Sequence, residues 1–307
     1  MKAIRNISIV GAGAMGAAYA AMFTDAAGFA VSFVARGKRY ERLKNKTLTV
    51  NDRLYNLPVV HPDKVSEPAD LVLVALKHHH LEGAVDDIAA LVGKDTAILS
   101  VMNGLESEAT IGAACGMDKL VYAIAVGIDA VRENDRFTYA NPGKIVFGPI
   151  GDGGRGPKLD RIQEALDRAG IPNEVPVDIV QAMWWKFMIN VGINQASAVL
   201  RATYGVFQSS PDARTLIRSL MEEVVSLAKK AGIGLSEADI DEWDIIMNNL
   251  SATGKTSMLQ DVEAGRKTEV EIFAGKVVAL GNQYLVPTPV NVTLQRIIKV
   301  IEYKNGV

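Results

Sequence analysis

The feature that most constrains this chain is a glycine-rich turn close to its N-terminus. Residues 7–10 form a short apolar run, which leads directly into Gly11-Ala12-Gly13-Ala14-Met15-Gly16 and then into an Ala-rich stretch that favours a helix. This is the G-x-G-x-x-G pattern in its proper context, between a strand and a helix. Gly11 permits a tight turn, Gly13 lets a pyrophosphate approach the backbone, and Gly16 lets the helix pack closely on the strand. The turn predicts that residues 11–16 bind a dinucleotide; a turn that serves packing alone is the alternative.

Further apolar runs give the first half of the chain an alternating pattern. They span residues 29–35, 71–76, 97–102, 120–128 and 144–149. Short β-rich runs separated by helical patterns indicate βαβ units and a mainly parallel sheet. Residues 47–60 differ, and they predict an antiparallel excursion with a turn at Asn51-Asp52.

The pattern changes near residue 178. A loop rich in Gly and Pro at 148–157 precedes one more helix, and residues 171–177 hold two prolines. From residue 178 onward the apolar spacing is almost wholly helical. We predict an α/β fold in which a Rossmann-type dinucleotide-binding domain, residues 1–177, is followed by an all-α domain, residues 178–307.

Composition excludes several classes of function. The chain has 307 residues and a formal charge of -2, so it offers no basic surface for nucleic acid or for a membrane. Its one cysteine, Cys115, leaves no intramolecular disulfide and favours a reducing compartment, and small neighbours predict a packed thiol. No apolar run reaches the ~18 residues of a membrane span, and the apolar N-terminal stretch suits a strand better than a signal sequence. We expect a cytoplasmic protein.

The residue after the second apolar run indicates which dinucleotide is bound. An NAD site usually has Asp or Glu there to accept from the ribose 2′-OH. Here the run ends in FVARGKR, which places Arg36 at that position and two more cations close behind. Because a cation pairs with a 2′-phosphate, Arg36 predicts NADP as the cofactor. An ordinary solvated basic loop is the alternative.

Polar residues follow the next two apolar runs. Lys77 comes directly after residues 71–76, and Asn103 follows residues 97–102. Open parallel sheets bind ligands at the carboxyl ends of their strands, so we expect Lys77 to lie at the ligand-binding edge. Asn103 lies at the equivalent edge and can serve the nicotinamide ribose or the substrate, with a simple turn as the alternative. The three histidines at 78–80 predict no metal site, because sequence neighbours point to different faces and no carboxylate or cysteine cluster accompanies them.

A carbonyl reduction needs a proton donor for the developing alkoxide. All four histidines lie in the first half of the chain, and no Tyr-x-x-x-Lys pattern surrounds Tyr122 or Tyr139. The segment WWKFMINVGIN, residues 184–194, places Lys186, Asn190 and Asn194 on one helix face. Neighbouring tryptophans would partly desolvate the ammonium of Lys186 and favour its acidity. Lys186 is therefore the best candidate for a general acid, and a snorkelling lysine at a helix edge is the alternative.

Taken in order, these motifs give the chain a specific resemblance. It resembles the ketopantoate reductase (2-dehydropantoate 2-reductase) family over nearly its whole length. The motifs are GAGAMG, Leu76-Lys77, Asn103-Gly104, the spacing of Trp184, Lys186, Asn190 and Asn194, and Ser257-Met-Leu-Gln-Asp261 continuing to Lys267-Thr-Glu269. The resemblance implies a Rossmann-type domain, a helical domain and an active site in the cleft between them. It also implies that NADPH reduces ketopantoate to pantoate, a step toward pantothenate and coenzyme A.

The resemblance further implies a role for each candidate residue. Lys186 would be the general acid, Asn190 and Asn194 would bind the hydroxyl and keto oxygens, and Ser257 would hold the carboxylate. Glu269 would orient the substrate and the nicotinamide ribose, and Arg36, Lys77 and Asn103 would bind the cofactor. From the residues themselves, Ser257 and Gln260 predict a capping box that opens a helix containing Glu269.

Two departures from the family pattern leave alternatives open. Tyr204 lies near the place where relatives often have a further asparagine, which favours another 2-oxo or 3-hydroxy acid as the alternative substrate. His80 occupies a position that would face cofactor phosphate or ribose. A non-catalytic NADP-binding sensor is the rival from another class of protein. The helical segments have enough apolar surface for a homodimer, but core packing explains the same residues.

Overall fold

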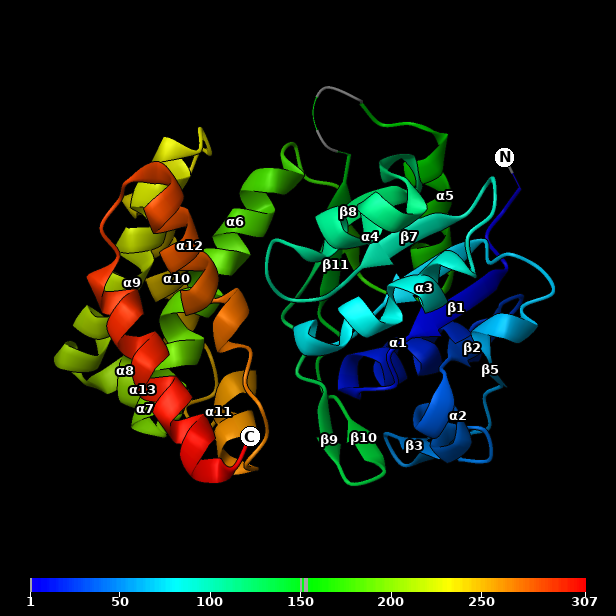
Figure 1. Cartoon of the computed structure of the whole chain (residues 1–307), viewed down its shortest axis with the longest axis horizontal. Helices are drawn as coiled ribbons and strands as arrows, with labels where there is room; N and C mark the ends of the chain where they lie inside the picture. Colours follow the sequence, from blue (N-terminus) through cyan, green and yellow to red (C-terminus); the bar gives the residue numbers. More distant parts are fainter. Residues whose placement is uncertain (1, 150, 152–153) are drawn as a thin grey trace. The chain divides into compact units, whose positions relative to one another are not determined.

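The computed structural model describes residues 2–149, 151 and 154–307, and the chain folds into two compact units, Met1–Ile179 and Val180–Val307. Figure 1 shows strands and helices in the first unit and helices in the second. The α/β fold with a helical C-terminal part is therefore confirmed. Within the described residues no helix combines the length and apolar character that a membrane crossing requires.

The first unit is built on an eight-stranded sheet of order β12-β11-β8-β7-β6-β1-β2-β5. The strands are β1 (Asn6–Val10), β2 (Ala30–Val34), β5 (Val59–Val60), β6 (Leu71–Val74), β7 (Ala97–Ser100), β8 (Leu120–Val126), β11 (Lys144–Gly148) and β12 (Asn173–Glu174). All neighbours run parallel except β8 and β11, which are antiparallel. The predicted parallel sheet is confirmed, and its short buried strands explain the apolar runs in the sequence.

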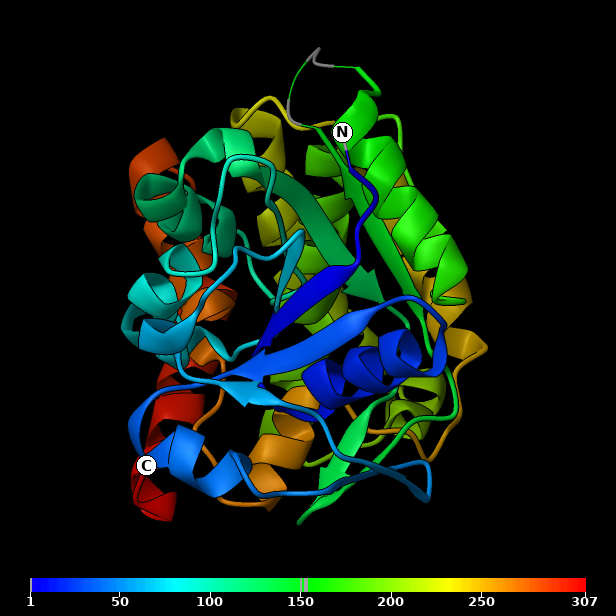
Figure 2. The ribbon, with the colours of Figure 1, turned by 90° about the vertical axis from the view of Figure 1, so that its right-hand side faces the viewer.

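Helices cover both faces of this sheet (Figure 2). They are α1 (Ala14–Asp25), α2 (Gly37–Leu43), α3 (Val85–Ala89), α4 (Ser107–Cys115) and α5 (Pro157–Arg168). Side chains alternate along a strand, so Leu71 and Leu73 pack in a core with α1 and α5, whereas Val72 and Val74 pack in a second core with α3 and α4. Helices cover both faces, and open parallel sheets of this kind generally bind ligands at the carboxyl ends of their strands.

A smaller four-stranded sheet joins segments that are far apart in the sequence. Its order is β4-β3-β10-β9, from β3 (Leu48–Val50), β4 (Arg53–Tyr55), β9 (Val131–Glu133) and β10 (Arg136–Thr138). The antiparallel pair β3–β4 and its turn at Asn51-Asp52 are confirmed, and both turn residues have positive φ, 45° and 60°. The prediction for the last part of residues 47–60 is wrong. Strand β5 is not part of the antiparallel hairpin and pairs in parallel with β2 of the main sheet.

The second unit contains only helices. They are α6 (Ile179–Ile189, whose first residue belongs to the first unit), the π-helix η5 (Asn190–Asn194), α7 (Gln195–Leu200), α8 (Tyr204–Ser209), α9 (Pro211–Lys230), α10 (Glu237–Asn248), α11 (Ser257–Glu263), the 3₁₀ helix η6 (Val270–Ile272), α12 (Ala274–Tyr284) and α13 (Pro289–Asn305).

A polar network connects helices α7, α9 and α13 of the second unit. Glu223 on α9 accepts from the backbone N–H of Val290 at 2.8 Å and from Nδ2 of Asn291 at 2.7 Å, and Gln195 on α7 donates to Oδ1 of Asn291 at 2.9 Å. Because the side chains of Glu223, Gln195 and Asn291 are buried, this network fixes α7 against α9 and α13.

Candidate active site

The glycine turn joins β1 to α1 at the carboxyl edge of the sheet. Gly11 has φ +118°, and a Cβ on it would lie 2.4 Å from the carbonyl oxygen of Ala75. A Cβ on Gly16 would lie 1.8 Å from the carbonyl oxygen of Gly11. A Cβ on Gly13 would meet nothing within 4 Å. Gly11 and Gly16 are therefore required by the fold, whereas Gly13 leaves open space above the backbone.

The N-terminus of α1 has the features of an anion site. Its N-cap is Gly13, which makes no side-chain cap, and the first turn contains no acidic residue. The first N–H groups of a helix have no partner within the helix, and the helix dipole favours negative charge there. The open space at Gly13 and the uncapped helix end fit a pyrophosphate.

Arg36, the predicted cofactor residue after β2, lies between two carboxylates. Its Nε donates to Oδ1 of Asp87 at 2.7 Å, while its NH2 and NH1 groups donate to the two oxygens of Asp63 at 2.8 and 3.3 Å. Asp63 belongs to the 3₁₀ helix η1 (Pro62–Lys64) that follows β5, and Asp87 belongs to α3. The hydrogen bond to Asp87 is the largest of the effects that raise the pKa of Arg36. No local sequence pattern indicates either partner, because Asp63 and Asp87 lie 27 and 51 residues away from Arg36.

Lys77 and Asn103 lie at the same carboxyl edge, after β6 and β7, and both side chains are partly buried. Lys77 immediately precedes the 3₁₀ helix η2 (His78–His80). Burial, followed by the nearby charges of Arg39, His79 and Lys77, lowers the pKa of His80 to about 4, so its imidazole is neutral at pH 7. Among the described residues there is no group of three or more His, Cys, Asp or Glu side chains that could hold a metal ion.

The predicted polar row lies on α6 and η5 in the second unit. The α-helix ends at Ile189, and Asn190–Asn194 forms a π-helical turn in place of the continuous α-helix that we predicted. Asn194 is 6% exposed and donates from Nδ2 to Oδ1 of Asn190 at 3.3 Å, so the two amides remain on one face. π-Helical turns inside helices are frequently found at functional sites.

Gly192 explains how this turn packs. A Cβ on Gly192 would lie 2.5 Å from Cε of Met221 and 3.3 Å from the carbonyl oxygen of Ile217, both on α9. The glycine therefore lets η5 approach α9 closely, on the side away from the asparagines.

The structure corrects the predicted cap at Ser257. The N-cap of α11 is Thr256, whose Oγ1 accepts from the backbone N–H of Leu259 at 3.2 Å. Thr256 is buried and also shares a hydrogen bond with the hydroxyl of Ser197, whereas Ser257 is the exposed first residue of the helix. The hydroxyl of Ser257 is therefore not engaged as the helix cap.

Glu269 does not lie in the helix that contains Ser257, which is a second correction. Helix α11 ends at Glu263, because Gly265 adopts φ +61° and the N–H of Arg266 turns back to the carbonyl oxygen of Asp261. Glu269 is the partly buried residue before η6. Its neighbour Thr268 donates from N and Oγ1 to Oε1 of Glu302 at 2.8 and 2.7 Å. The buried Glu302 of α13 therefore fixes the backbone next to Glu269, a role that nothing in the sequence indicated.

Tyr204 packs against the loop that leads into α11. Its N–H donates to the carbonyl oxygen of Gly254 at 3.0 Å, and a Cβ on Gly254 would lie 2.8 Å from the tyrosine ring. Burial raises the pKa of the phenol. The ring thus lies beside the segment that ends at Thr256 and Ser257.

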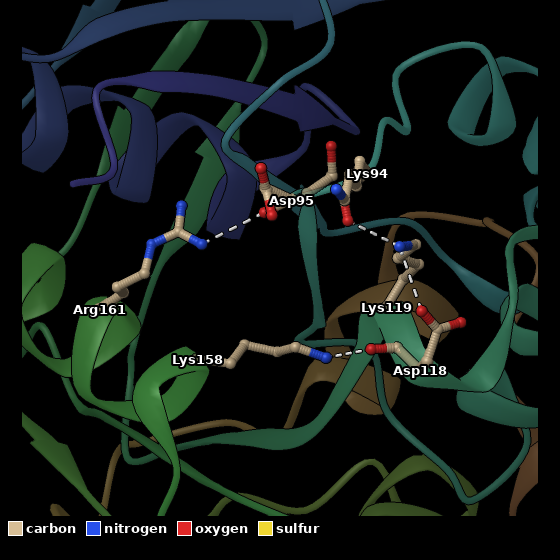
Figure 3. Close-up of a pocket in the computed structure, with 7 residues that line it drawn as sticks. Lys94, Asp95, Asp118, Lys119, Lys158 and Arg161 are labelled. Atoms are coloured by element: carbon tan, nitrogen blue, oxygen red, sulfur yellow. Dashed lines mark hydrogen bonds and ion pairs between the residues drawn. The ribbon is translucent and has the colours of Figure 1, made fainter. Parts of the chain in front are cut away.

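A cavity of about 160 Å³ lies elsewhere in the first unit (Figure 3). It is lined by Lys94, Asp95, Thr96, Asp118, Lys119, Lys158 and Arg161. Several of these residues directly precede β7 and β8, at the amino edge of the sheet. None of the predicted site residues lines this cavity, and its position separates it from the glycine turn.

The fold, the glycine turn of the first unit and the polar row on α6 and η5 of the second unit point to a class of protein. This class is a dinucleotide-binding oxidoreductase with a Rossmann-type unit and a helical unit. The family model described as Ketopantoate reductase PanE/ApbA matches residues 7–152, and the model of its C-terminal part matches residues 178–302. The chain therefore belongs to the ketopantoate reductase family. It is an oxidoreductase that acts on a 2-keto acid, and the family and fold indicate a nicotinamide dinucleotide as its cofactor.

Individual relatives resemble the chain along nearly its whole length. A 2-dehydropantoate 2-reductase of Archaeoglobus fulgidus is 28% identical over 300 residues, which cover 97% of this chain and 98% of the relative. The structure of a D-mandelate dehydrogenase with NADH and anilino(oxo)acetate has a TM-score of 0.90 at 22% identity, covering 98% of this chain and 99% of the other. A dimeric ketopantoate reductase from Staphylococcus aureus has a TM-score of 0.83 at 21% identity, again covering 98% and 99%. Both structures are evidence for the fold alone.

Proposed function

We propose that this chain reduces ketopantoate to pantoate with NADPH as the hydride donor. The observation that carries the proposal is the polar row on α6 and η5, where Lys186, Asn190 and Asn194 follow one another at intervals of four residues. The hydrogen bond between the asparagine amides, 3.3 Å long, supports a shared face. An ammonium followed by two amides suits a substrate that carries a keto oxygen and a hydroxyl group.

The chemistry assigned to this face is protonation of the developing alkoxide. A bound nicotinamide dinucleotide supplies a hydride to the carbonyl carbon, and the electrons of the C=O π bond move to the oxygen. In the proposal Lys186 donates a proton from Nζ to that oxygen, which leaves a neutral amine and an alcohol. The two amides hold the oxygens in place, and Glu269 orients substrate and nicotinamide ribose.

The first unit is proposed to bind the cofactor. Gly11, Ala12, Gly13, Ala14, Met15 and Gly16 would surround the pyrophosphate, and Lys77 and Asn103 would serve the phosphate and the nicotinamide ribose. The open space at Gly13 and the uncapped end of α1 support this assignment. Arg36 is proposed to bind the 2′-phosphate, which would favour NADPH.

Thr256 and Ser257 provide a test of the substrate carboxylate site. We expect Thr256→Ala to lower the free energy of unfolding by about 1 kcal/mol, because it removes a helix cap. We expect Ser257→Ala to leave thermal stability unchanged but to raise KM for the keto acid about tenfold or more, because a hydrogen bond to a carboxylate is lost. Thermal melts and steady-state kinetics on both variants would separate the two roles. A Ser257→Ala enzyme with unchanged KM would remove Ser257 from the carboxylate site.

Another 2-oxo acid is the second candidate substrate, and Tyr204 is the observation that favours it. Its ring lies beside the loop that leads into α11, near the place where relatives often have an asparagine. The structural relative that binds anilino(oxo)acetate is a dehydrogenase of mandelate, an aromatic hydroxy acid. A tyrosine at this place could pack against such an aromatic substrate.

A panel of 2-keto acids distinguishes these candidates. The panel contains ketopantoate, pyruvate, 2-oxoisovalerate and phenylglyoxylate, with oxidation of NADPH and NADH followed by absorbance. We expect the highest kcat/KM with ketopantoate and NADPH. A higher kcat/KM with phenylglyoxylate would overturn the proposed substrate, and cofactor binding without turnover of any acid would favour a sensor protein.

The proposal includes a homodimer, as described for the relative from Staphylococcus aureus. Light scattering on the same preparation measures the mass in solution, and a monomer would remove this part of the proposal.

A further inference from the structure

Arg36 presents its guanidinium to two carboxylates in different ways. Asp87 accepts only from Nε, on the side of the group, whereas Asp63 accepts from NH1 and NH2 together at the end of the group. Two parallel N–H···O bonds at that end form the bidentate arrangement that arginine uses for carboxylates and phosphates. Asp63 therefore occupies the edge of Arg36 that would bind a 2′-phosphate.

The two carboxylates also differ in burial. The side chain of Asp87 is 11% exposed and that of Asp63 is 61% exposed. Ion pairs between exposed side chains contribute little to stability, so a ligand can displace Asp63 easily. The shielded bond between Asp87 and Nε persists more readily and keeps the guanidinium in one orientation.

We propose that Asp63 is a specificity-determining residue that weakens the preference for NADPH over NADH, and that Asp87 is a positioning residue for Arg36. The inference rests on the proposed function only in assuming that the adenosine ribose lies at the end of β2. Asp63 competes with the 2′-phosphate for the same two N–H groups. Once displaced, its negative charge remains close to the phosphate and repels it.

NADH would make different contacts with Arg36 and Asp63. It carries no 2′-phosphate, so the ion pair between Arg36 and Asp63 stays intact. The carboxylate of Asp63 can in addition accept from a ribose 2′-OH, which is the role of the acidic residue in NAD sites. One arginine and one exposed aspartate therefore supply a partner for either dinucleotide.

Direct binding measurements on four variants test this assignment. NADPH, NADH and the fragments 2′,5′-ADP and 5′-AMP are titrated by calorimetry into the wild type and into Asp63→Asn, Asp87→Asn, Arg36→Ala and Asp160→Asn. The last variant is the matched control, because Asp160 forms a similarly exposed ion pair with Arg155 at the same 2.8 Å. Each aspartate variant removes one negative charge with little change of shape.

The variants should change the affinities for NADPH and NADH in opposite directions or to different extents. We expect Asp63→Asn to tighten NADPH and 2′,5′-ADP about three- to tenfold and to leave NADH unchanged or weaker. We expect Asp87→Asn to weaken NADPH about three- to tenfold and Arg36→Ala to weaken it about tenfold or more, with smaller effects on NADH. Because salt screens interactions between charges, these changes in affinity should become smaller at high salt.

Two outcomes would overturn the inference. One is an Asp63→Asn protein whose NADPH affinity matches that of Asp160→Asn, although Arg36→Ala has lost NADPH. The other is equal tightening of NADPH and NADH by Asp63→Asn. Failure of the proposed function has different signatures: loss of the substrate assignment leaves these titrations unchanged, and a wild type that binds neither dinucleotide overturns both proposals.

Discussion

Replacement of Lys186 by alanine is expected to lower kcat by about 10²–10⁴, the usual contribution of a general acid. This range corresponds to about 2.7–5.4 kcal/mol of transition-state stabilisation. The expected loss is large because water is a much weaker acid than an ammonium group, and it has to supply the proton to the alkoxide when the side chain is absent. Steady-state kinetics with saturating keto acid and dinucleotide measures the loss.

The fold of the Lys186→Ala protein should be intact. Lys186 lies on α6 with a partly buried side chain, and alanine is the residue that helices tolerate best. Dinucleotide affinity should also be unchanged, because Lys186 is not among the residues proposed to bind the cofactor. Lys230→Ala, at the end of α9, is the matched control and should keep normal kcat.

A conservative variant tests whether the charge or the proton matters. Lys186→Arg keeps a positive charge, but a guanidinium gives up its proton with great difficulty. We therefore expect kcat of this variant to be close to that of Lys186→Ala. Full activity in Lys186→Ala would remove the general-acid role, and full activity in Lys186→Arg would show that only the charge is needed.

The parts of the fold that the sequence predicted are those set by local patterns. Apolar runs of four to nine residues indicated the positions of β1, β2, β6, β7, β8 and β11, because strands buried on both faces contain almost no polar residues. The glycine turn could be located because tight turns and close backbone contacts require glycine at fixed spacing. The polar row on residues 184–194 was visible because residues four apart share a face in an α-helix, and the amide pair keeps this arrangement within the π-helical turn.

The parts that the sequence did not predict depend on long-range contacts. Asp63 and Asp87 meet Arg36 only because β5 and α3 flank the end of β2 in the folded sheet, and no local pattern indicates this. Glu302 reaches Thr268 across 34 residues. The cap at Thr256 was missed for another reason: two adjacent hydroxyl residues both fit the pattern, and burial decides between them.

The glycine turn allows a second test with large expected effects, since two of its glycines should respond to alanine in different ways. Gly16→Ala places a Cβ 1.8 Å from a backbone oxygen, so α1 or the turn has to move. Overpacking of this kind costs about 1–3 kcal/mol or more. We expect a clearly lower melting temperature for Gly16→Ala, together with weaker dinucleotide binding.

Gly13→Ala should retain the fold and lose the ligand. The backbone at Gly13 has φ -84° and ψ -170°, an extended conformation that alanine also adopts, and the added Cβ meets no protein atom within 4 Å. The same Cβ projects into the space that a pyrophosphate would use. Each hydrogen bond to a charged group contributes about 1.5–3 kcal/mol, so the loss of one weakens dinucleotide affinity about 10–100-fold.

Gly156 provides the control for Gly13, because it is also the N-cap glycine of a helix. It precedes α5 with an extended backbone, and a Cβ on it would likewise meet nothing within 4 Å. Any general effect of alanine at an N-cap, about 1 kcal/mol, is therefore shared by Gly13→Ala and Gly156→Ala. Melting curves without ligand should match for the two variants, whereas calorimetry should show lost affinity for both NADPH and NADH in Gly13→Ala alone. Normal affinity in Gly13→Ala would mean that the turn serves packing and that the pyrophosphate binds elsewhere.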